Sequence, residues 1–127
     1  GCMGYENGEQ KRDFIYVKDV VKVLMHFFEH PVSGIFNCGT GRAQTFNDVA
    51  LSVVNSFHSN GNTISLNEAI DSKQIEYIHF PDDLLGKYQA YTEANLANLR
   101  KAGCDVQLRS VEEGVSDYMN YLKTKFI

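Results

Sequence analysis

The 127-residue sequence has no apolar run close to the roughly 20 residues that a membrane-spanning helix needs. It has no signal-peptide pattern at its start, and its first residue is Gly1 rather than a start methionine. We therefore expect either an added remnant or a cut from a longer polypeptide. Basic residues are not in excess, because 12 Lys and Arg stand against 16 Asp and Glu. We expect a cytoplasmic protein that binds neither a membrane nor nucleic acid.

Cysteine is scarce, and its spacing suggests no pairing. Cys2, Cys38 and Cys104 form an odd set that fits neither a disulfide framework nor a zinc knuckle. We expect a reduced intracellular protein with one or two buried thiols. His26 and His30 lie four positions apart on a predicted helix, but no third ligand is suggested nearby, so we expect no metal site.

The sequence also lacks most of the patterns that carry catalysis, including a Ser-His-Asp elbow and a cysteine with positive neighbours. Residues 39–41 read Gly-Thr-Gly between a predicted strand and a predicted helix, which is the setting of a dinucleotide-binding turn. Gln44 stands where the third glycine belongs, and no acidic residue follows at about 20 positions. We interpret this segment as a tight turn that lets the backbone approach a neighbour.

Two helices are predicted in the first half of the chain. Residues 19–30 repeat apolar side chains every three or four positions, and Pro31 ends this helix. Asp19 can accept hydrogen bonds from the first free N–H groups of the helix. A second helix is predicted to begin near Thr45, which forms a capping box with Asp48.

Two more helices are predicted in the second half. Thr92 caps a short helix that runs through Ala102 and stops at Gly103. Ser110 and Glu113 form a second capping box, which begins the final helix.

Three short runs have the composition of strands, at residues 14–17, 35–38 and 75–80. Together with four amphipathic helices they indicate the α/β class. Three strands make a thin sheet for four helices, so we expect one unit over residues 1–127 that is a piece of a larger fold.

Arg12 precedes the first predicted strand, at the edge of a strand–helix corner. A guanidinium in that place can reach outward, and its parallel N–H donors match the oxygens of a phosphate or carboxylate. Residue chemistry alone leaves a second interpretation open, a solvated surface arginine before an ordinary strand.

Residues 12–20 read RDFIYVKDV and are similar to the RDF-[IV]-YV-x-DV segment of extended short-chain dehydrogenases, which are nucleotide-sugar epimerases and dehydratases built on a Rossmann fold. Three more segments narrow the match: VSGIFNCGTGRA at 32–43, FPDDLLGKYQAYT at 80–92 and LRKAG at 99–103. Together they resemble the ADP-glyceromanno-heptose 6-epimerase family of lipopolysaccharide core precursor synthesis. The resemblance covers nearly the whole chain and corresponds to the C-terminal part of those enzymes.

The resemblance implies that the N-terminal dinucleotide-binding part is absent here, and that residues 59–73 are a loop insertion relative to the family. The family's glycine fingerprint and its Tyr-x-x-x-Lys pair, in which the lysine lowers the pKa of the tyrosine base, belong to that absent part. Tyr121 does have Lys125 at this spacing, but we interpret both as surface residues of the final helix. We therefore expect no catalytic or cofactor-binding residue in this chain, and no activity from the chain alone.

The substrate-facing residues carry over individually. Arg12 matches the family's arginine that contacts the substrate phosphates, and Tyr88 matches a substrate-contacting tyrosine. Lys87 stands where close relatives often have arginine. We expect Arg12 and Tyr88 to converge on one nucleotide-diphosphate site.

The resemblance thus implies the substrate-binding portion of an isomerase that inverts C6 of an ADP-sugar by transient oxidation with NADP or NAD. The alternatives are another nucleotide-sugar epimerase or dehydratase, and a non-catalytic α/β fragment that acts by association. We expect no cofactor bound to this chain alone. Its expected partners are the ADP-sugar, and either the absent N-terminal part or further copies of itself in a homo-oligomer.

Overall fold

A computed structural model describes residues 4–58 and 61–126. In these ranges the chain forms five α-helices, one 3₁₀ turn and a two-stranded antiparallel sheet, so the α/β mixture predicted from the sequence is present. No helix in the described ranges is long and apolar enough to cross a membrane. The elements, in chain order, are β1 (Lys11–Arg12), α1 (Val17–Glu29), β2 (Gln44–Thr45), α2 (Phe46–Ser56), α3 (Leu66–Asp71), η1 (Asp82–Leu84), α4 (Ala97–Lys101) and α5 (Val111–Phe126).

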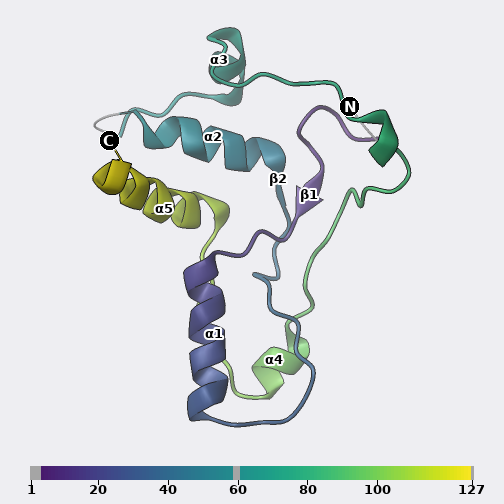
Figure 1. Cartoon of the computed structure of the whole chain (residues 1–127), viewed down its shortest axis with the longest axis vertical. Helices are drawn as coiled ribbons and strands as arrows, with labels where there is room; N and C mark the ends of the chain where they lie inside the picture. Colours follow the sequence, from purple (N-terminus) through teal and green to yellow (C-terminus); the bar gives the residue numbers. More distant parts are fainter. Residues whose placement is uncertain (1–3, 59–60, 127) are drawn as a thin grey trace.

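The elements form two groups that meet at the small sheet (Figure 1). Helices α2 and α5 lie side by side in one group, with α3 at its outer end. Helix α1 extends away from them with α4 beside its far end. In the sheet, Lys11 pairs with Thr45 and Arg12 with Gln44. Arg12 therefore lies at the junction of the two groups.

The prediction of three strands is wrong, because the structure has its strands elsewhere. Within the described residues, stretches 14–17, 35–38 and 75–80 pair with no neighbouring strand, and Val17 already belongs to α1. Strand propensity expresses how a side chain fits a half-buried surface, and it forms a ladder only where a partner strand lies alongside.

Each of these stretches instead packs an aromatic ring against a ring from another part of the chain. The centroid of Phe14 lies 5.3 Å from that of Phe46, and the centroid of Phe36 lies 4.8 Å from that of Phe27. Phe80 meets Tyr88 at 5.4 Å. The residues that suggested strands are thus used for packing.

The predicted helices are present, with differences at their ends. The two capping boxes are confirmed, because Thr45 and Asp48 exchange hydrogen bonds at the start of α2, and Ser110 and Glu113 do so at the start of α5. Gly103, at a φ of +88°, ends the helix before it as predicted.

Two predicted caps are wrong. Helix α1 begins at Val17, after Tyr16, so Asp19 lies inside its first turn. Thr92 lies five residues before α4, and its hydroxyl accepts the backbone N–H of Asp13 at 3.4 Å. In both cases the side chain bonds a segment far away in the sequence, which a local cap pattern cannot reveal.

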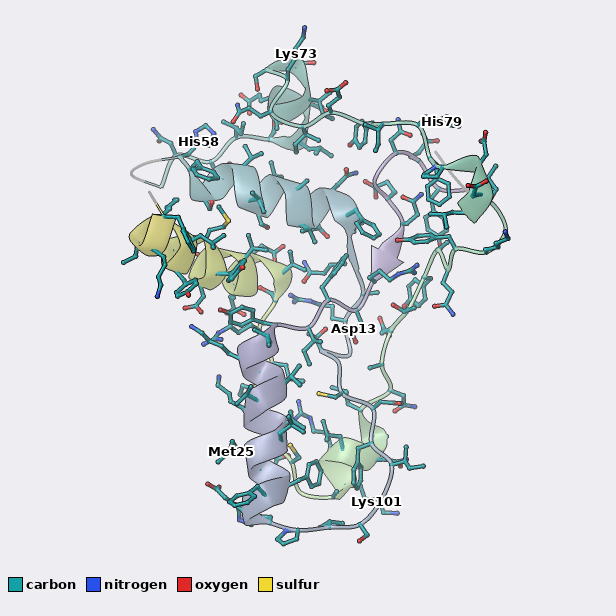
Figure 2. All side chains as sticks on the ribbon, in the orientation of Figure 1. Asp13, Met25, His58, Lys73, His79 and Lys101 are labelled. Carbon is teal, nitrogen blue, oxygen red and sulfur yellow. The ribbon has the colours of Figure 1, made fainter. Side chains whose placement is uncertain are left out.

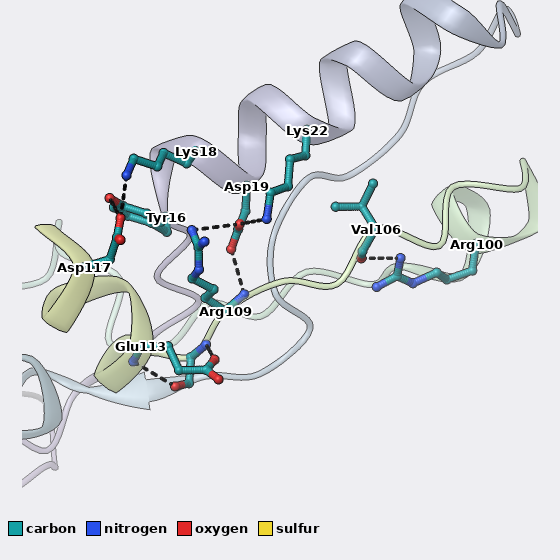
Figure 3. Close-up of polar contacts among 10 residues, drawn as sticks. Tyr16, Lys18, Asp19, Lys22, Arg100, Val106, Arg109, Glu113 and Asp117 are labelled. Atoms are coloured by element: carbon teal, nitrogen blue, oxygen red, sulfur yellow. Dashed lines mark hydrogen bonds and ion pairs between the residues drawn. The ribbon is translucent and has the colours of Figure 1, made fainter.

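Asp19 is fully buried and joins α1 to the segment before α5 (Figure 3). Its carboxylate accepts the backbone N–H of Arg109 at 2.7 Å and lies 3.2 Å from the Lys22 ammonium. Nearby, Asp117 of α5 accepts hydrogen bonds of 2.6 Å from both the Tyr16 hydroxyl and the Lys18 ammonium. These contacts fix the start of α1 against α5.

The core between α1 and α4 contains Val23, Leu99 and Cys104, which are almost fully buried. Leu96 packs against this core beside Leu99. The buried thiol of Cys104 confirms one of the expected buried cysteines, whereas Cys38 is exposed and Cys2 lies outside the described residues.

One face of α1 is apolar and exposed. The predicted apolar stripe includes Leu24 and Phe28, but these side chains are 63% and 80% exposed. They align with Val17 and Val21 at helical spacing, and Met25 points away from α4 (Figure 2). The described residues leave this face of the helix without a partner.

Residues 59–73, predicted as a loop, contain helix α3. Residues 59 and 60 lie outside the described ranges, but Ser65 and Glu68 form a capping box at the start of α3. The loop interpretation missed this box because the helix has only six residues and too few turns for periodicity to show. That the stretch is an insertion relative to the family stays a prediction.

Candidate functional site

Arg12 and Tyr88, 76 positions apart, lie against each other. The central carbon of the Arg12 guanidinium lies 4.6 Å from the centroid of the Tyr88 ring. This is the geometry of a cation–π contact, in which the ring face attracts the positive charge. The predicted convergence of these two side chains is therefore present, while their role in binding stays a prediction.

Tyr88 is held near Arg12 by backbone contacts of its segment with β1. The N–H of Lys11 donates to the carbonyl of Ala90 at 2.9 Å, and the N–H of Thr92 donates back to the carbonyl of Lys11 at 3.2 Å. The chain from Ala90 to Thr92 thus runs alongside β1, and Tyr88 precedes it by two residues.

Lys87 is exposed, next to Tyr88 in the sequence. Within the described residues its ammonium group has no hydrogen-bond or ion-pair partner. It is free to approach an anion, but the structure does not bring it onto the Arg12–Tyr88 contact.

Tyr88 also lines a cavity of about 650 Å³. The cavity lies between α2 and residues 75–80, and its walls are largely apolar, with Phe46, Ile75 and Phe80 among them. A mostly apolar hollow beside a cationic group is the usual form of a small-molecule site.

The polar end of this cavity is formed by Asn47, which is buried. Its Oδ1 accepts the Tyr77 hydroxyl at 2.7 Å, and its Nδ2 donates to Glu9 Oε1 at 2.6 Å and to the carbonyl of Asn7 at 3.0 Å. Gly8 is required here, because a Cβ at that position would lie 2.0 Å from Asn47 Oδ1. The sequence interpretation missed Asn47 and Tyr77, since neither belongs to a motif.

Asp13, the residue after Arg12, fastens the turn at 39–41. Its Oδ1 accepts the backbone N–H of Thr40 at 2.7 Å and the hydroxyl of Thr40 at 2.6 Å. Its Oδ2 accepts the N–H groups of Gly41 at 2.9 Å and Ala94 at 3.0 Å. Partial burial acts to raise the pKa of the Asp13 carboxyl, but these hydrogen bonds outweigh it and bring the pKa below its ordinary value.

The turn itself does not fit a dinucleotide. Its N–H groups at Thr40 and Gly41 already donate to Asp13, so they are not available to a pyrophosphate. A Cβ at Gly39 would lie 2.6 Å from both Ala94 Cβ and Asp13 Oδ2. The predicted close approach of the backbone to a neighbour is confirmed.

The two other residue pairs considered in the sequence analysis do not lie in this site. Tyr121 is half exposed on α5, with the Lys125 ammonium 5.9 Å from its ring centroid, so both are surface residues as predicted. His26 and His30 stack their rings at 4.9 Å. The described residues contain no group of three or more side chains that could hold a metal ion.

Known proteins resemble this chain over nearly its whole length. Residues 2–39 match the NAD dependent epimerase/dehydratase family. The ADP-L-glycero-D-manno-heptose-6-epimerase of Thiobacillus denitrificans is 53% identical over 125 residues, which is 96% of this chain. The chain spans only 38% of the length of that relative. The similarity indicated by the motifs is thereby confirmed, and it relates this chain to part of an ADP-L-glycero-D-manno-heptose-6-epimerase.

Proposed function

We propose that this chain is the C-terminal, substrate-binding portion of an ADP-glyceromanno-heptose 6-epimerase and that it binds the diphosphate of an ADP-sugar. Arg12 supplies a planar fork of N–H donors for the phosphate oxygens. Tyr88 adds a hydroxyl and a ring face, and Lys87 a mobile positive charge. The observation that carries the proposal is the contact of Arg12 with Tyr88 beside the apolar cavity.

The whole enzyme inverts C6 of the sugar, and a nicotinamide cofactor, NADP or NAD, supplies the transient oxidation when bound. The residues of this chain hold the nucleotide and orient the sugar; the base and the cofactor loop belong to the N-terminal part. The turn at 39–41 supports that division. Its N–H groups at Thr40 and Gly41 already donate to Asp13, so they are not available to the pyrophosphate of a dinucleotide cofactor. The chain alone should therefore bind no cofactor and have no epimerase activity.

The exposed apolar face of α1 supports a further part of the proposal. Val17, Val21, Leu24 and Phe28 would be covered by the N-terminal part of the enzyme, or by another copy of this chain where that part is absent. The isolated chain should therefore associate with itself at high concentration.

Two measurements test the proposed function. ADP is titrated into isotope-labelled protein, and the amide and side-chain signals of Arg12 and Tyr88 should shift together, ahead of signals from α3. Unchanged signals at millimolar ADP count against the site. In the second measurement, purified chain is mixed with ADP-heptose and NADP, and epimer formation above a buffer control would refute the division of labour.

A further inference from the structure

The carboxylate of Asp13 has no unused acceptor capacity. Each carboxylate oxygen offers about two lone-pair positions, and each oxygen of Asp13 receives two donors. The donors come from two places in the chain, Thr40 and Gly41 in the turn and Ala94 in the segment after Tyr88. Asp13 therefore fastens both segments to the residue that follows Arg12.

The segment that carries Tyr88 has its attachments on either side of Arg12. Before Arg12, Lys11 exchanges backbone hydrogen bonds with Ala90 and Thr92. After Arg12, the carboxylate of Asp13 accepts the Ala94 N–H, and the Asp13 N–H reaches the Thr92 hydroxyl. By contrast, residues 81–87 are exposed, and the backbone bonds at Leu84, Leu85 and Lys87 stay within that loop. Tyr88 itself donates its N–H to the Leu84 carbonyl at 3.1 Å and meets the Phe80 ring, but its segment is attached to β1, and so to Arg12, through residues 90–94.

We propose that Asp13 is a positioning residue for the substrate site: its carboxylate fixes residues 90–94 against β1 and so keeps the Tyr88 ring on the Arg12 guanidinium. Asp13 does not touch the ligand in this proposal. The expected effect on ADP-sugar binding rests on the proposed function. The placement of the Tyr88 ring does not, because it is a property of the chain without ligand.

The arrangement requires a carboxylate. An asparagine at position 13 would keep one acceptor oxygen, and its NH₂ group would face two N–H or O–H donors of the chain. Whichever way the amide is turned, either the Thr40 donors or the pair from Gly41 and Ala94 loses its acceptor. The lowered pKa of Asp13 agrees with a site that needs the charged form.

The test is Asp13→Asn in the 127-residue chain, with Asp19→Asn as the matched control. Asp19 is also a carboxylate that accepts a backbone N–H, but it joins α1 to Arg109 rather than to residues 90–94. The readout is the nuclear Overhauser effect between the Arg12 side chain and the Tyr88 ring, measured without ligand. We expect the effect in the wild type and in Asp19→Asn, and its loss in Asp13→Asn.

Retention of the effect in Asp13→Asn would overturn the proposal, and so would its loss in both variants, which would indicate general loosening. Titration with ADP forms the second arm, in which Asp13→Asn should bind roughly tenfold more weakly than Asp19→Asn. If wild-type protein shows the contact but no response to ADP, the proposed function fails while the positioning by Asp13 stands.

Discussion

The buried carboxylate of Asp19 accepts a hydrogen bond of 2.7 Å from the backbone N–H of Arg109, 90 positions later in the chain. The Arg109 side chain adds a contact of 3.4 Å to the same carboxylate. The start of α1 is thus attached to the segment that leads into α5.

Asp19→Ala should destabilise the protein, because it leaves the Arg109 N–H without its acceptor. The loss of one buried charge-assisted partner costs about 1–3 kcal/mol. Urea unfolding followed by circular dichroism measures it, with the exposed Asp71→Ala as control. Equal midpoints for the two variants would contradict the structural role of Asp19.

Arg12→Ala should weaken ADP-sugar binding by the complete enzyme roughly ten- to a hundredfold, as expected for one desolvated charge-assisted contact. Tyr88→Phe keeps the ring on which the guanidinium lies and should cost only about 0.5–1.5 kcal/mol, for one neutral hydrogen bond. Calorimetry with ADP measures both, and cofactor affinity should barely change. Arg42→Ala is the control, since Arg42 is exposed and, among the described residues, its side chain donates only to Gln44; a loss as large as that of Arg12→Ala would refute the assignment.

Gly39→Ala should destabilise the junction, because the new methyl group would lie 2.6 Å from Ala94 Cβ and from Asp13 Oδ2. Overpacking of this kind costs about 1–3 kcal/mol. Gly34→Ala is the comparison, since a methyl group there would meet one side chain, the tip of the Phe36 ring at 2.8 Å, rather than two groups of the junction. Thermal unfolding of the two variants should show the larger drop for Gly39→Ala.

Acid should weaken the protein partly through Asp13. Its pKa in the folded chain lies below the ordinary value of 3.8, so its contribution to stability is present above that value and is lost as pH falls through the folded pKa. The free energy of unfolding should therefore decline below about pH 4. Asp13→Asn should be less stable at neutral pH and should lose less on acidification, and parallel pH curves for variant and wild type would contradict this.

Leu24→Glu should reduce self-association by placing a charge on the exposed apolar face of α1. Sedimentation velocity over a concentration series measures it. Asn67→Glu adds the same charge at an exposed position of α3, which lies at the opposite end of the structure from α1 (Figure 1), and should leave association unchanged. A wild-type chain that stays monomeric at high concentration would argue against the proposed covering of this face.

The features predictable from sequence are those that short segments determine by themselves. Thr45 with Asp48 and Ser110 with Glu113 mark helix starts within four residues, and the structure has both. Ladder formation at 75–80 depends on a partner strand that the described residues do not supply, so propensity alone misled there.

The same distinction applies to the site. The sequence could place Arg12 and Tyr88 in one site because the resemblance to a known family relates residues that are far apart in the chain. Helix and strand periodicity relates only neighbouring residues. Asn47 could not, because its hydrogen bonds to Tyr77 and Glu9 arise only when distant segments meet.

The carboxylate of Asp13 is shared by the N–H groups of Thr40, Gly41 and Ala94, and this makes their exposure to solvent a common event. When Asp13 moves out of this position, the turn at 39–41 and Ala94 lose their acceptor together, so an opening that displaces Asp13 exposes both segments. The amide protons of two loops more than fifty positions apart should then exchange with deuterium as one cooperative unit.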